Sequence, residues 1–519
     1  MKRSTALLAT ADHPHDNAQR DLRRISSQRM IVRLDSAGSS MPLSQEAQAV
    51  LASLGAKGSS LCCDGRLILV TLASEVDAAA ALDRLRALPG VRYAVPDDVV
   101  SLAVFLPNDP QFAAQWALKN TAGVDIDATR AWDQTTGNST TLVAVMDTGI
   151  DYRHPDLYLS IAINQGEIPA SLKSQIVDTN GNGLVDFYDL NSLDANGNVV
   201  LDSSGQKYNR ALVTDHNGKG YIDAGDLMFP PWTDGTDNDG NGLVDDIVGW
   251  DHLGNSNNPM DTFGHGTHVA STIGARGNNG TGIAGVNWRV RLLPERFHAG
   301  DGGTISDAIR AINHAVTQGA KVINSSWGTT VNNPALRDAV DWAGQQGVVV
   351  VAAAGNGSSN IDNPQVAYYP AAYSLTNLIS VASVDINGNL SGFSNYGLTK
   401  VHLGAPGENI LGAAPGSGYA MWNGTSMATA HVTGVVSLLA GLFPNASPQW
   451  LVDRTLSTVR PLSGLAGKTT TGGMLEAFSA INTTNTAGPR ILSASPIGDV
   501  ATPTDRVTLT FDRSITAST

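Results

Sequence analysis

The sequence predicts an α/β protein with a doubly wound, mostly parallel sheet. Short apolar segments alternate with amphipathic helical segments along the middle of the chain, a pattern typical of parallel strands joined by crossover helices. Gly319 and Gly347 follow two predicted helices, where a C-terminal capping glycine belongs. Asp147 and Asn356 each follow a predicted strand directly. Because ligands bind beyond the carboxyl ends of such strands, both side chains are candidates for a functional site.

The individual elements are predicted from hydrophobic periodicity. Strands are expected where short runs are apolar, at residues 141–146, 290–293, 321–323, 348–352, 378–383 and 402–403. Helices are expected where apolar residues recur at three- and four-residue spacing, at residues 268–274, 306–318, 334–345 and 427–442. Helices on both faces would bury this sheet on both sides.

The pattern divides the chain into four parts. Residues 1–27 form a flexible polar segment, and residues 28–104 form a small α+β domain. The large α/β domain covers residues 107–484 and starts with a linker-like segment at 107–121. Residues 488–519 resemble the linker and first strands of an Ig-like β-sandwich, which we expect to continue past Thr519 because two strands cannot bury a core. Inside the small domain, strands are expected at 30–34, 67–72 and 91–95, and helices at 45–54 and 76–88.

Charge and composition exclude several classes of protein. The formal net charge is −14, and residues 178–251 contain 14 aspartates, no glutamate and three Lys or Arg residues, a net charge of −11. This is not the basic footprint of a nucleic-acid-binding protein. Cys62 and Cys63 provide no disulfide framework. No apolar run reaches the length of a membrane span, and the short apolar run after Lys2-Arg3 makes a poor signal peptide.

Three short segments present a carboxylate, an imidazole and a hydroxyl in the order Asp, His, Ser. They are Val143–Gly149, Gly264–Ala270 and Asn423–Ala428. Each alone has an ordinary structural explanation: Asp147 as a strand-end turn residue, His265 as a histidine near a turn, Ser426 as a helix N-cap. Together and in this order they predict a nucleophilic triad.

A fourth segment, Val350–Gly357, adds an amide. Asn356 follows a buried strand, where it can donate to an oxyanion, although an Asn-Gly turn is the alternative. His268 lies one helical turn after His265, but the Glu of a zinc-binding HExxH motif is missing, so we interpret His268 as structural. An esterase of the α/β-hydrolase type is disfavoured because it needs Gly-x-Ser-x-Gly and the order Ser, Asp, His.

These segments resemble those of the subtilisin-like serine peptidases, the subtilase family, from about Pro107 to Asn482. The resemblance implies that Asp147 orients His265, that His265 acts as general base and acid, that Ser426 attacks and that Asn356 stabilises the oxyanion. It also implies a substrate-binding role for five residues: Ser326, Trp327, Gly328, Ala353 and Gly355. Two residues depart from the family pattern, Ala430 in place of a proline and Glu295 in place of an apolar or basic residue.

Residues 28–104 resemble, more loosely, the inhibitory prosegment of the same family, best at Leu88–Asp97. Such a segment assists folding and occupies the cleft until it is removed. The resemblance therefore implies a zymogen that cleaves itself between Pro96 and Pro110, with its own prosegment as intramolecular inhibitor.

An acidic insertion at about 157–260 contains loops with oxygen-bearing residues at positions 1, 3, 5 and 9 and glycine at position 6. This spacing matches the calcium loop of an EF-hand, and the alternative is a solvated loop without metal. The ligands predicted for the first loop are Asp178, Asn180, Asn182 and Asp186, and those for the third are Asp237, Asp239, Asn241, Asp245 and Asp246. The second loop, which starts at Asp215, has Lys219 where an oxygen is wanted. By resemblance, Asp156 and Asn279 match a further calcium site of the family.

The preferred hypothesis is a secreted or cell-surface serine endopeptidase that acts on proteins or peptides, is stabilised by Ca2+ and needs no organic cofactor. We expect a monomer without a nucleic-acid partner or membrane span. The alternative is a calcium-binding surface protein with an inactive peptidase scaffold, which labelling of Ser426 by an organophosphate would distinguish.

Overall fold

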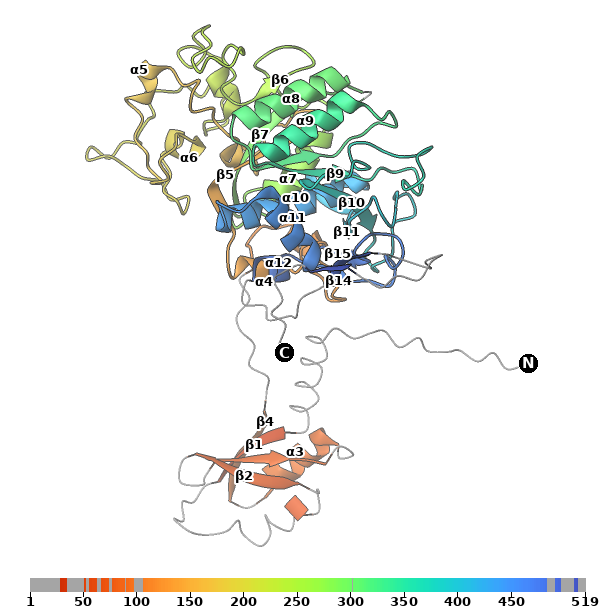
Figure 1. Cartoon of the computed structure of the whole chain (residues 1–519). Helices are drawn as coiled ribbons and strands as arrows, with labels where there is room; N and C mark the ends of the chain where they lie inside the picture. Colours follow the sequence, from red (N-terminus) through yellow and green to blue (C-terminus); the bar gives the residue numbers. More distant parts are fainter. Residues whose placement is uncertain are drawn as a thin grey trace, which may run out of the picture. The chain divides into compact units, whose positions relative to one another are not determined.

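A nine-stranded sheet is the centre of the larger of two units of the computed structural model, Val104–Thr519. Its strand order is β14-β15-β11-β10-β9-β8-β5-β7-β6, and Figure 1 labels all of these strands except β8. The strands from β15 to β6 pair in parallel, and β14 pairs antiparallel with β15 at one edge. The strands in this order are β14 (Arg460–Pro461), β15 (Gly473–Met474), β11 (Leu403–Pro406), β10 (Leu378–Val384), β9 (Val349–Ala353), β8 (Val322–Ser325), β5 (Gly137–Asp147), β7 (Arg289–Arg296) and β6 (Trp250–Asp251).

Helices cover both faces of this sheet, as the sequence predicts. Alternate residues of β5 point to opposite sides: Val143 and Val145 enter one hydrophobic core with α7 and α10, and Ala144 and Met146 enter the other with α8 and α9. The doubly wound α/β fold is thereby confirmed. The helices of this unit are α4 (Ala128–Trp132), α5 (Ala170–Lys173), α6 (Phe187–Leu190), α7 (His265–Gly274), α8 (Ile305–Thr317), α9 (Pro334–Gln345), α10 (Thr425–Leu442), α11 (Pro448–Ser457) and α12 (Ala477–Ile481).

Helix α10 is the central helix of the domain. Within the part of the chain that the structure describes, it is long and apolar enough to cross a membrane, but 89% of that stretch is buried inside the protein. A helix that is apolar on all sides is typical of a core position between two layers.

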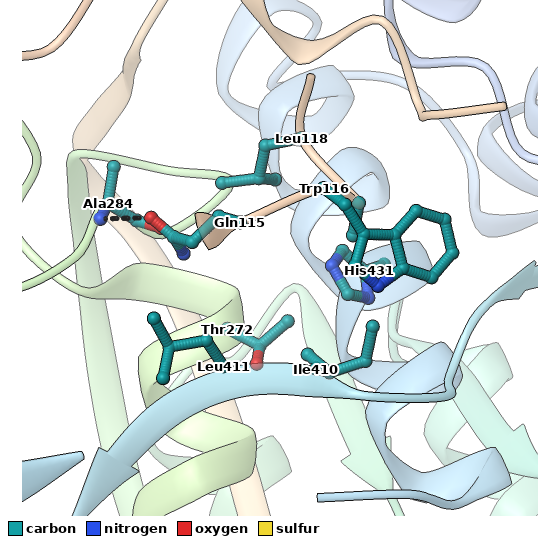
Figure 2. Close-up of a pocket in the computed structure, with 9 residues that line it drawn as sticks. Gln115, Trp116, Leu118, Thr272, Ala284, Ile410, Leu411 and His431 are labelled. Carbon is teal, nitrogen blue, oxygen red and sulfur yellow. Dashed lines mark hydrogen bonds between the residues drawn. The ribbon is translucent and has the colours of Figure 1, made fainter. Parts of the chain in front are cut away.

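The segment before β5 is not a linker, contrary to the sequence interpretation. Ala117 and Leu118 are buried, and the Gln115 amide donates to the carbonyl of Ala284 at 2.8 Å and accepts from its N–H at 2.9 Å. Figure 2 shows Gln115, Trp116 and Leu118 at a small pocket that also contacts Thr272 and His431. The two prolines of this segment give it the composition of a linker. Its tertiary contacts nevertheless hold it in place.

The acidic insertion contains short elements joined by turns. These include η2 (Tyr158–Ser160) and η3 (Ala224–Met228) besides α5 and α6. A hairpin of β12 (Ile410–Ala414) and β13 (Gly418–Trp422) precedes α10 and was not predicted, because its turn residues were not recognised.

The smaller unit, Met1–Ala103, has a four-stranded antiparallel sheet of order β2-β3-β1-β4 with helix α3 (Ala78–Arg86). The strands are β1 (Arg29–Leu34), β2 (Lys57–Cys62), β3 (Leu67–Thr71) and β4 (Val91–Pro96). Strand β2 was not predicted, because Lys57–Cys62 is polar and lies at the edge of the sheet, where one neighbour suffices.

The structure describes residues 29–34, 51–52, 56–62, 67–73, 77–88, 90–97, 106–300, 302–482, 491–495 and 508–511. Of the helix predicted at 45–54, only residues 51 and 52 are within these ranges, and both are helical. Strands β16 (Ile491–Ser495) and β17 (Thr508–Phe511) pair antiparallel. The remainder of the predicted Ig-like β-sandwich lies outside the described residues, as does the N-terminal segment 1–27.

Candidate active site

A buried aspartate, Asp147, and a partly exposed histidine, His265, form a hydrogen-bonded pair at the carboxyl end of the sheet. Asp147 ends β5 and is 2% exposed, and His265 is the first residue of α7. Asp147 Oδ1 lies 2.7 Å from His265 Nδ1 and accepts from the Thr148 N–H at 2.8 Å. A carboxylate at Nδ1 favours the tautomer in which Nε2 is the proton acceptor.

The surroundings of His265 favour its protonated form. Burial by itself lowers the pKa of this imidazole, but the charge of Asp147, its hydrogen bond to the ring and the charge of Asp261 outweigh burial and raise the pKa above its usual value. An imidazolium formed by proton transfer is therefore stabilised, as general base catalysis requires.

Asp261 holds the start of α7 through hydrogen bonds. The sequence analysis did not identify it. It is 3% exposed, and its Oδ1 accepts from Thr148 Oγ1 at 2.9 Å and from the Gly264 N–H at 2.8 Å. Its Oδ2 accepts from Thr267 N–H and Oγ1 at 2.9 and 2.6 Å. An aspartate just before a helix start is a capping signal, so the spacing to α7 could have identified it.

Ser426 lies in the first turn of α10, beside one of the predicted substrate-binding residues. Its hydroxyl donates to the Ser326 carbonyl at 3.1 Å, and the Ser326 hydroxyl donates to the Ser426 carbonyl at 3.0 Å. The Ser426 hydroxyl thus bonds to Ser326 and not to His265, so the attack predicted from the sequence would require it to rotate towards His265. Catalytic hydrogen bonds often tighten only when substrate is bound, so this rotamer is compatible with catalysis.

The amide of Asn356 is held so that its nitrogen is available. Its Oδ1 accepts from both the N–H and the hydroxyl of Thr425 at 2.9 Å. A Cβ built on Gly424 would lie 3.6 Å from both Asn356 Nδ2 and the backbone N of Ser426. The two donors therefore border one small space, which glycine leaves open and which an oxyanion could occupy.

Asn395 fixes the loop that carries Asn356, and the sequence analysis missed it as well. Its Nδ2 donates to the Ala354 carbonyl at 2.8 Å, and its Oδ1 accepts from the N–H groups of Gly357 and Ser359 at 3.0 and 2.9 Å. No short-range signal points to it, because its partners lie about 40 residues earlier in the chain.

The other predicted substrate-binding residues follow β8 and β9, and a tyrosine lies between them. A Cβ on Gly328 would be 2.3 Å from Tyr368 Cε1, and one on Gly355 would be 2.9 Å from Tyr368 Cδ1. The ring of Tyr368 thus contacts both glycines. Trp327 packs edge-to-face on Phe297, and Ala353 is buried at the end of β9.

His268 lies between backbone carbonyls, in agreement with its interpretation as structural. Its Nε2 is 3.0 Å from the Ile410 carbonyl and 3.2 Å from the Ala420 carbonyl, and its ring stacks on Trp422. Burial lowers its pKa to about 4, so the ring is neutral and donates to the hairpin.

The three acidic loops share one backbone geometry. Their first residues, Asp178, Asp215 and Asp237, each accept from the N–H groups three, four and five positions later, at 2.7 to 3.3 Å. The glycines at position 6 have positive φ angles of 78°, 84° and 92°, which explains why glycine is needed there; they are Gly183, Gly220 and Gly242.

In each loop, a further carboxylate accepts a hydrogen bond from the backbone N–H at position 2. The N–H at position 2 donates to Asp189 in the first loop, to Asp226 in the second and to Glu167 in the third, at 2.7, 2.8 and 2.9 Å. Asp189 and Asp226 stand at position 12 of the motif. Glu167 precedes the third loop by about 70 residues, so no spacing rule could have found it. Oxygens of Glu167, Asp237 and Asp239 lie within 4.8 Å of one another.

Several of these carboxyl groups are costly to ionise without a cation. Burial and the neighbouring Asp186 raise the pKa of Asp189 to about 7, and burial and Asp226 raise that of Asp223 to about 6. Burial also raises the pKa of Glu167 to about 7. A hard divalent cation would offset this cost, so the donor set fits Ca2+.

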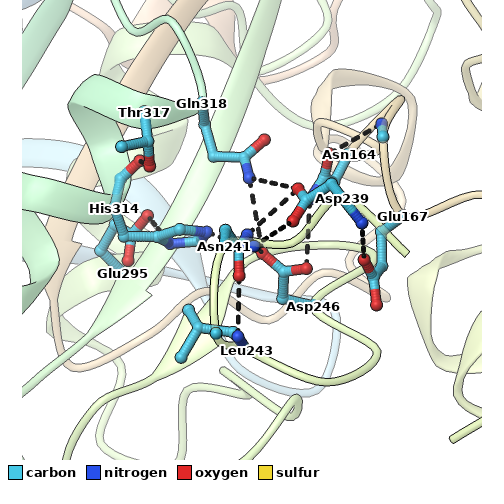
Figure 3. A network of polar contacts seen from close by, with 12 residues as sticks. Asn164, Glu167, Asp239, Asn241, Leu243, Asp246, Glu295, His314, Thr317 and Gln318 are labelled. Atoms are coloured by element: carbon cyan, nitrogen blue, oxygen red, sulfur yellow. Dashed lines mark hydrogen bonds and ion pairs between the residues drawn. The ribbon is translucent and has the colours of Figure 1, made fainter. Parts of the chain in front are cut away.

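The predicted ligands of the loops are brought together only in part. The Asn180 and Asn182 amides both donate to Asp186 in the first loop. In the third loop, Asp245 accepts from the N–H groups of residues 234 and 235, and Asp246 faces helix α8 (Figure 3).

Asp156 and Asn279, predicted from the resemblance, are in direct contact. The Asn279 amide donates to Asp156 Oδ1 at 3.0 Å, and Asp156 Oδ2 accepts from Ile283 N–H and Tyr419. Asp109 lies beside them: burial raises its pKa to about 6, with a contribution from the Asp156 charge. Its buried Oδ1 has no hydrogen-bond partner among the described residues. A calcium ion would supply that partner. The carboxylates of Asp109 and Asp156 fit such a site, whereas Asn279 turns its amide nitrogen to Asp156 and its oxygen to the Thr281 N–H.

The chain is similar to known peptidases. The model of the "Subtilase family" matches residues 138–487. Thermitase of Thermoactinomyces vulgaris is 46% identical over 202 residues, which are 39% of this chain and 70% of thermitase. A thermophilic serine proteinase of Bacillus sp. (strain AK1) is 33% identical over 363 residues, which are 70% of this chain and 66% of that protein.

Two further similarities extend over most of the chain. The "Extracellular protease" of Xanthomonas campestris pv. campestris is 31% identical over 425 residues, or 78% of this chain and 61% of that protein. A solved structure of a protease from Pseudoalteromonas arctica is 27% identical, with a TM-score of 0.49, and covers 73% of this chain and 99% of its own. The chain thus spans 61% to 70% of the length of these three curated relatives.

Proposed function

Because the chain belongs to the subtilase family of serine-type endopeptidases, we propose that it hydrolyses peptide bonds with Asp147, His265 and Ser426 as a nucleophilic triad. The observation that carries this proposal is the 2.7 Å hydrogen bond between Asp147 and His265. It holds the imidazole at the start of α7 in the tautomer that can accept the Ser426 proton.

The reaction follows from the positions of these groups. As Ser426 Oγ bonds to the scissile carbonyl carbon, its proton moves to His265 Nε2, and the carbonyl oxygen becomes an oxyanion. Asn356 Nδ2 and the Ser426 N–H donate to that oxyanion. His265 then protonates the leaving nitrogen, the C–N bond breaks and an acyl-enzyme remains. Water, deprotonated by His265, releases the acid and restores Ser426.

We further propose that the smaller unit is an intramolecular inhibitor. This unit has a four-stranded sheet and a hydrophobic core of its own, which is compatible with a detachable domain. Self-cleavage between Pro96 and Pro110 would remove this unit. The remaining peptidase would start within that range, a few residues before Gln115.

Calcium would stabilise the peptidase at two kinds of site. Asp156, Asn279 and Asp109 would hold one ion near the start of the mature chain, and the acidic loops would hold others. Bound Ca2+ would neutralise the buried carboxylates and so stabilise the fold. An extracellular location is supported by the relative from Xanthomonas that is named an extracellular protease, and millimolar calcium suits that location.

A time course of the full-length chain on a gel tests this function. Wild type is compared with Ser426→Ala and with Ser204→Ala, an exposed serine of the insertion that serves as matched control. We expect wild type and the control to lose the segment up to residues 96–110 and to digest casein, while Ser426→Ala stays intact. Faster loss of the whole chain in chelator would support the role of calcium.

Two results would contradict these proposals. If all three proteins stay full length and none digests casein, the triad proposal is wrong and the calcium-binding scaffold becomes the better interpretation. If wild type digests casein but keeps its N-terminus, only the self-cleavage proposal is wrong.

A further inference from the structure

A second cluster of chemically active side chains lies outside the catalytic site, where the insertion meets the sheet. His252 follows β6, Glu295 lies in β7 and His314 in α8. Glu295 Oε2 is 2.6 Å from His252 Nε2, and Glu295 Oε1 is 2.8 Å from His314 Nδ1. Figure 3 shows Glu295 and His314 next to Asp246.

All three side chains are removed from solvent. His252, Glu295 and His314 are 4%, 0% and 3% exposed. Donor atoms from the three lie within 4.8 Å of one another. Glu295 and His314 are held by a strand and a helix, and His252 lies in the turn after β6, where its N–H donates to the Arg296 carbonyl at 2.7 Å.

The orientation of His314 is set by Asp246. His314 Nε2 lies 2.8 Å from Asp246 Oδ2, which also accepts from the Asn241 amide at 3.0 Å. In the neutral ring, a proton on Nε2 leaves a lone pair on Nδ1. This lone pair faces Glu295 Oε1 at 2.8 Å. Two electron-rich atoms at that distance repel each other unless a cation lies between them.

The cation can be a proton or a metal ion. Burial by itself lowers the pKa of His314, but the charge of Glu295 and the contacts of the ring with Asp246 and Glu295 raise it to about 10, so without a metal this cation is a proton. A proton on Nδ1 would make a strong, aligned hydrogen bond to Glu295. Although they are 2.8 Å apart, neither His314 Nδ1 nor Glu295 Oε1 makes an aligned hydrogen bond to any described residue. Buried polar atoms without such bonds are costly.

We propose that His252, Glu295 and His314 bind a divalent transition metal of the zinc class. Two imidazoles and one carboxylate are a known donor set for Zn2+. Asp246 would act from outside the coordination sphere, because a carboxylate on the second nitrogen of a metal-bound histidine fixes its orientation. The metal would tie β6, β7, α8 and the third acidic loop together.

The two Glu295 contacts would need only a small adjustment for a metal ion to bind. With metal–ligand distances of about 2.0 to 2.2 Å, tetrahedral donors lie about 3.3 Å apart. The Glu295 contacts of 2.6 and 2.8 Å would therefore widen by less than 1 Å. The imidazole nitrogen donors, which suit zinc-class metals, also separate this site from the all-oxygen calcium loops.

The test uses the full chain with Ser426→Ala, which prevents self-digestion, in saturating calcium. After dialysis against Zn2+ and then against metal-free buffer, zinc per chain is measured by mass spectrometry. A parallel sample with Co2+ is examined for the visible absorption of a tetrahedral cobalt site. Glu295→Gln and Asp246→Asn are compared with His216→Gln, an exposed histidine of the insertion.

We expect one zinc per chain in the parent and in His216→Gln, and a higher thermal midpoint with zinc. Glu295→Gln should lose stoichiometric metal, and Asp246→Asn should bind cobalt roughly 10- to 100-fold more weakly. If the parent protein retains no metal, shows no cobalt absorption and melts at the same temperature with and without zinc, the proposal is wrong and a proton joins the cluster. This decision rests on the parent, so it stands even if Glu295→Gln does not fold.

Discussion

Gly266→Ala tests whether close packing at the start of α7 sets the catalytic geometry. Gly266 follows His265 and is buried. A Cβ at this position would lie 2.0 Å from the Gly149 carbonyl oxygen and 3.2 Å from Asp147 Oδ1. The added methyl group therefore pushes directly between α7 and the end of β5, the two elements that carry the histidine and the aspartate.

The size of the effect follows from these distances. Real Cβ contacts are essentially never below 3.0 Å, so the oxygen and the new carbon must separate by at least 1.0 Å. If this shift falls along the bond from Asp147 to His265, its length rises from 2.7 Å to about 3.7 Å, which is no longer a hydrogen bond. A misplacement of about 1 Å costs roughly 100-fold in rate, and overpacking costs about 1–3 kcal/mol of stability.

The assay is the hydrolysis of a chromogenic peptide by the mature enzyme. We expect kcat to fall roughly 100-fold with little change in KM, because the nearest atoms to the added methyl group belong to Gly149 and Asp147 and not to the predicted substrate-binding residues. Gly392→Ala is the matched control, since a Cβ there meets no atom within 4 Å. The thermal midpoint of each variant, measured in the Ser426→Ala background, distinguishes a loss of rate caused by misplaced catalytic groups from a loss of folded protein. A Gly266→Ala enzyme whose kcat/KM stays within roughly threefold of wild type would refute the reasoning.

Three further predictions concern the oxyanion, the base and the metal loops. Asn356→Ala should lower kcat by roughly 100- to 1,000-fold, about 2.7–4 kcal/mol, with KM nearly unchanged; a change confined to KM would exclude an oxyanion role. The raised pKa of His265 should place the acid limb of kcat/KM above pH 6.5, since the neutral imidazole is the active form and activity therefore rises with pH through that pKa; a pH–rate profile with its limb below that value would contradict this. Glu167 has a pKa of about 7 without metal, so Ca2+ must displace its proton below that pH. Calorimetric titrations on either side of pH 7 should show affinity falling as pH falls, by up to roughly tenfold per unit. Glu167→Gln should weaken this dependence and leave the part due to Asp189, whose pKa burial also raises to about 7; equal pH dependence in the variant would place the proton elsewhere.

The sequence predicted the sheet and its covering helices because local patterns encode them. The apolar runs of β5, β9 and β10 are buried on both faces, and such strands are recognisable without knowledge of their partners. The β12–β13 hairpin was missed because its turn residues were not recognised. Strand β2 was missed because its stability comes from pairing with β3 rather than from its own composition. The supposed linker before β5 was misinterpreted for the same reason, since the contact between Gln115 and Ala284 joins residues 169 apart.

The candidate site also combines residues that local patterns identify with residues that only tertiary contacts reveal. The residues of the triad and Asn356 stand in short motifs, so local patterns identified them as candidates. Asp261 and Asn395 act on these residues through side-chain hydrogen bonds, and their own sequence surroundings are ordinary. In the insertion, the spacing of the loops was recognisable, whereas Glu167 completes the third loop from a distant segment and leaves no periodic trace.

Glu295 connects the sheet, which local patterns predict, with the acidic insertion, which depends on distant contacts. It departs from the family pattern, and a lone buried carboxylate in a central strand would be strongly destabilising. Its partners explain why it can be there: the charge of His314, together with the His252 and His314 contacts, outweighs burial and lowers the pKa of the Glu295 carboxyl. His314 in turn binds Asp246 of the insertion. The unusual residue in the sheet and the extra segment on the surface are therefore parts of one buried network. Because the insertion supplies both His252 and Asp246, removing it should leave Glu295 paired with His314 alone and His314 without its Asp246 partner, and should therefore lower the stability of the core.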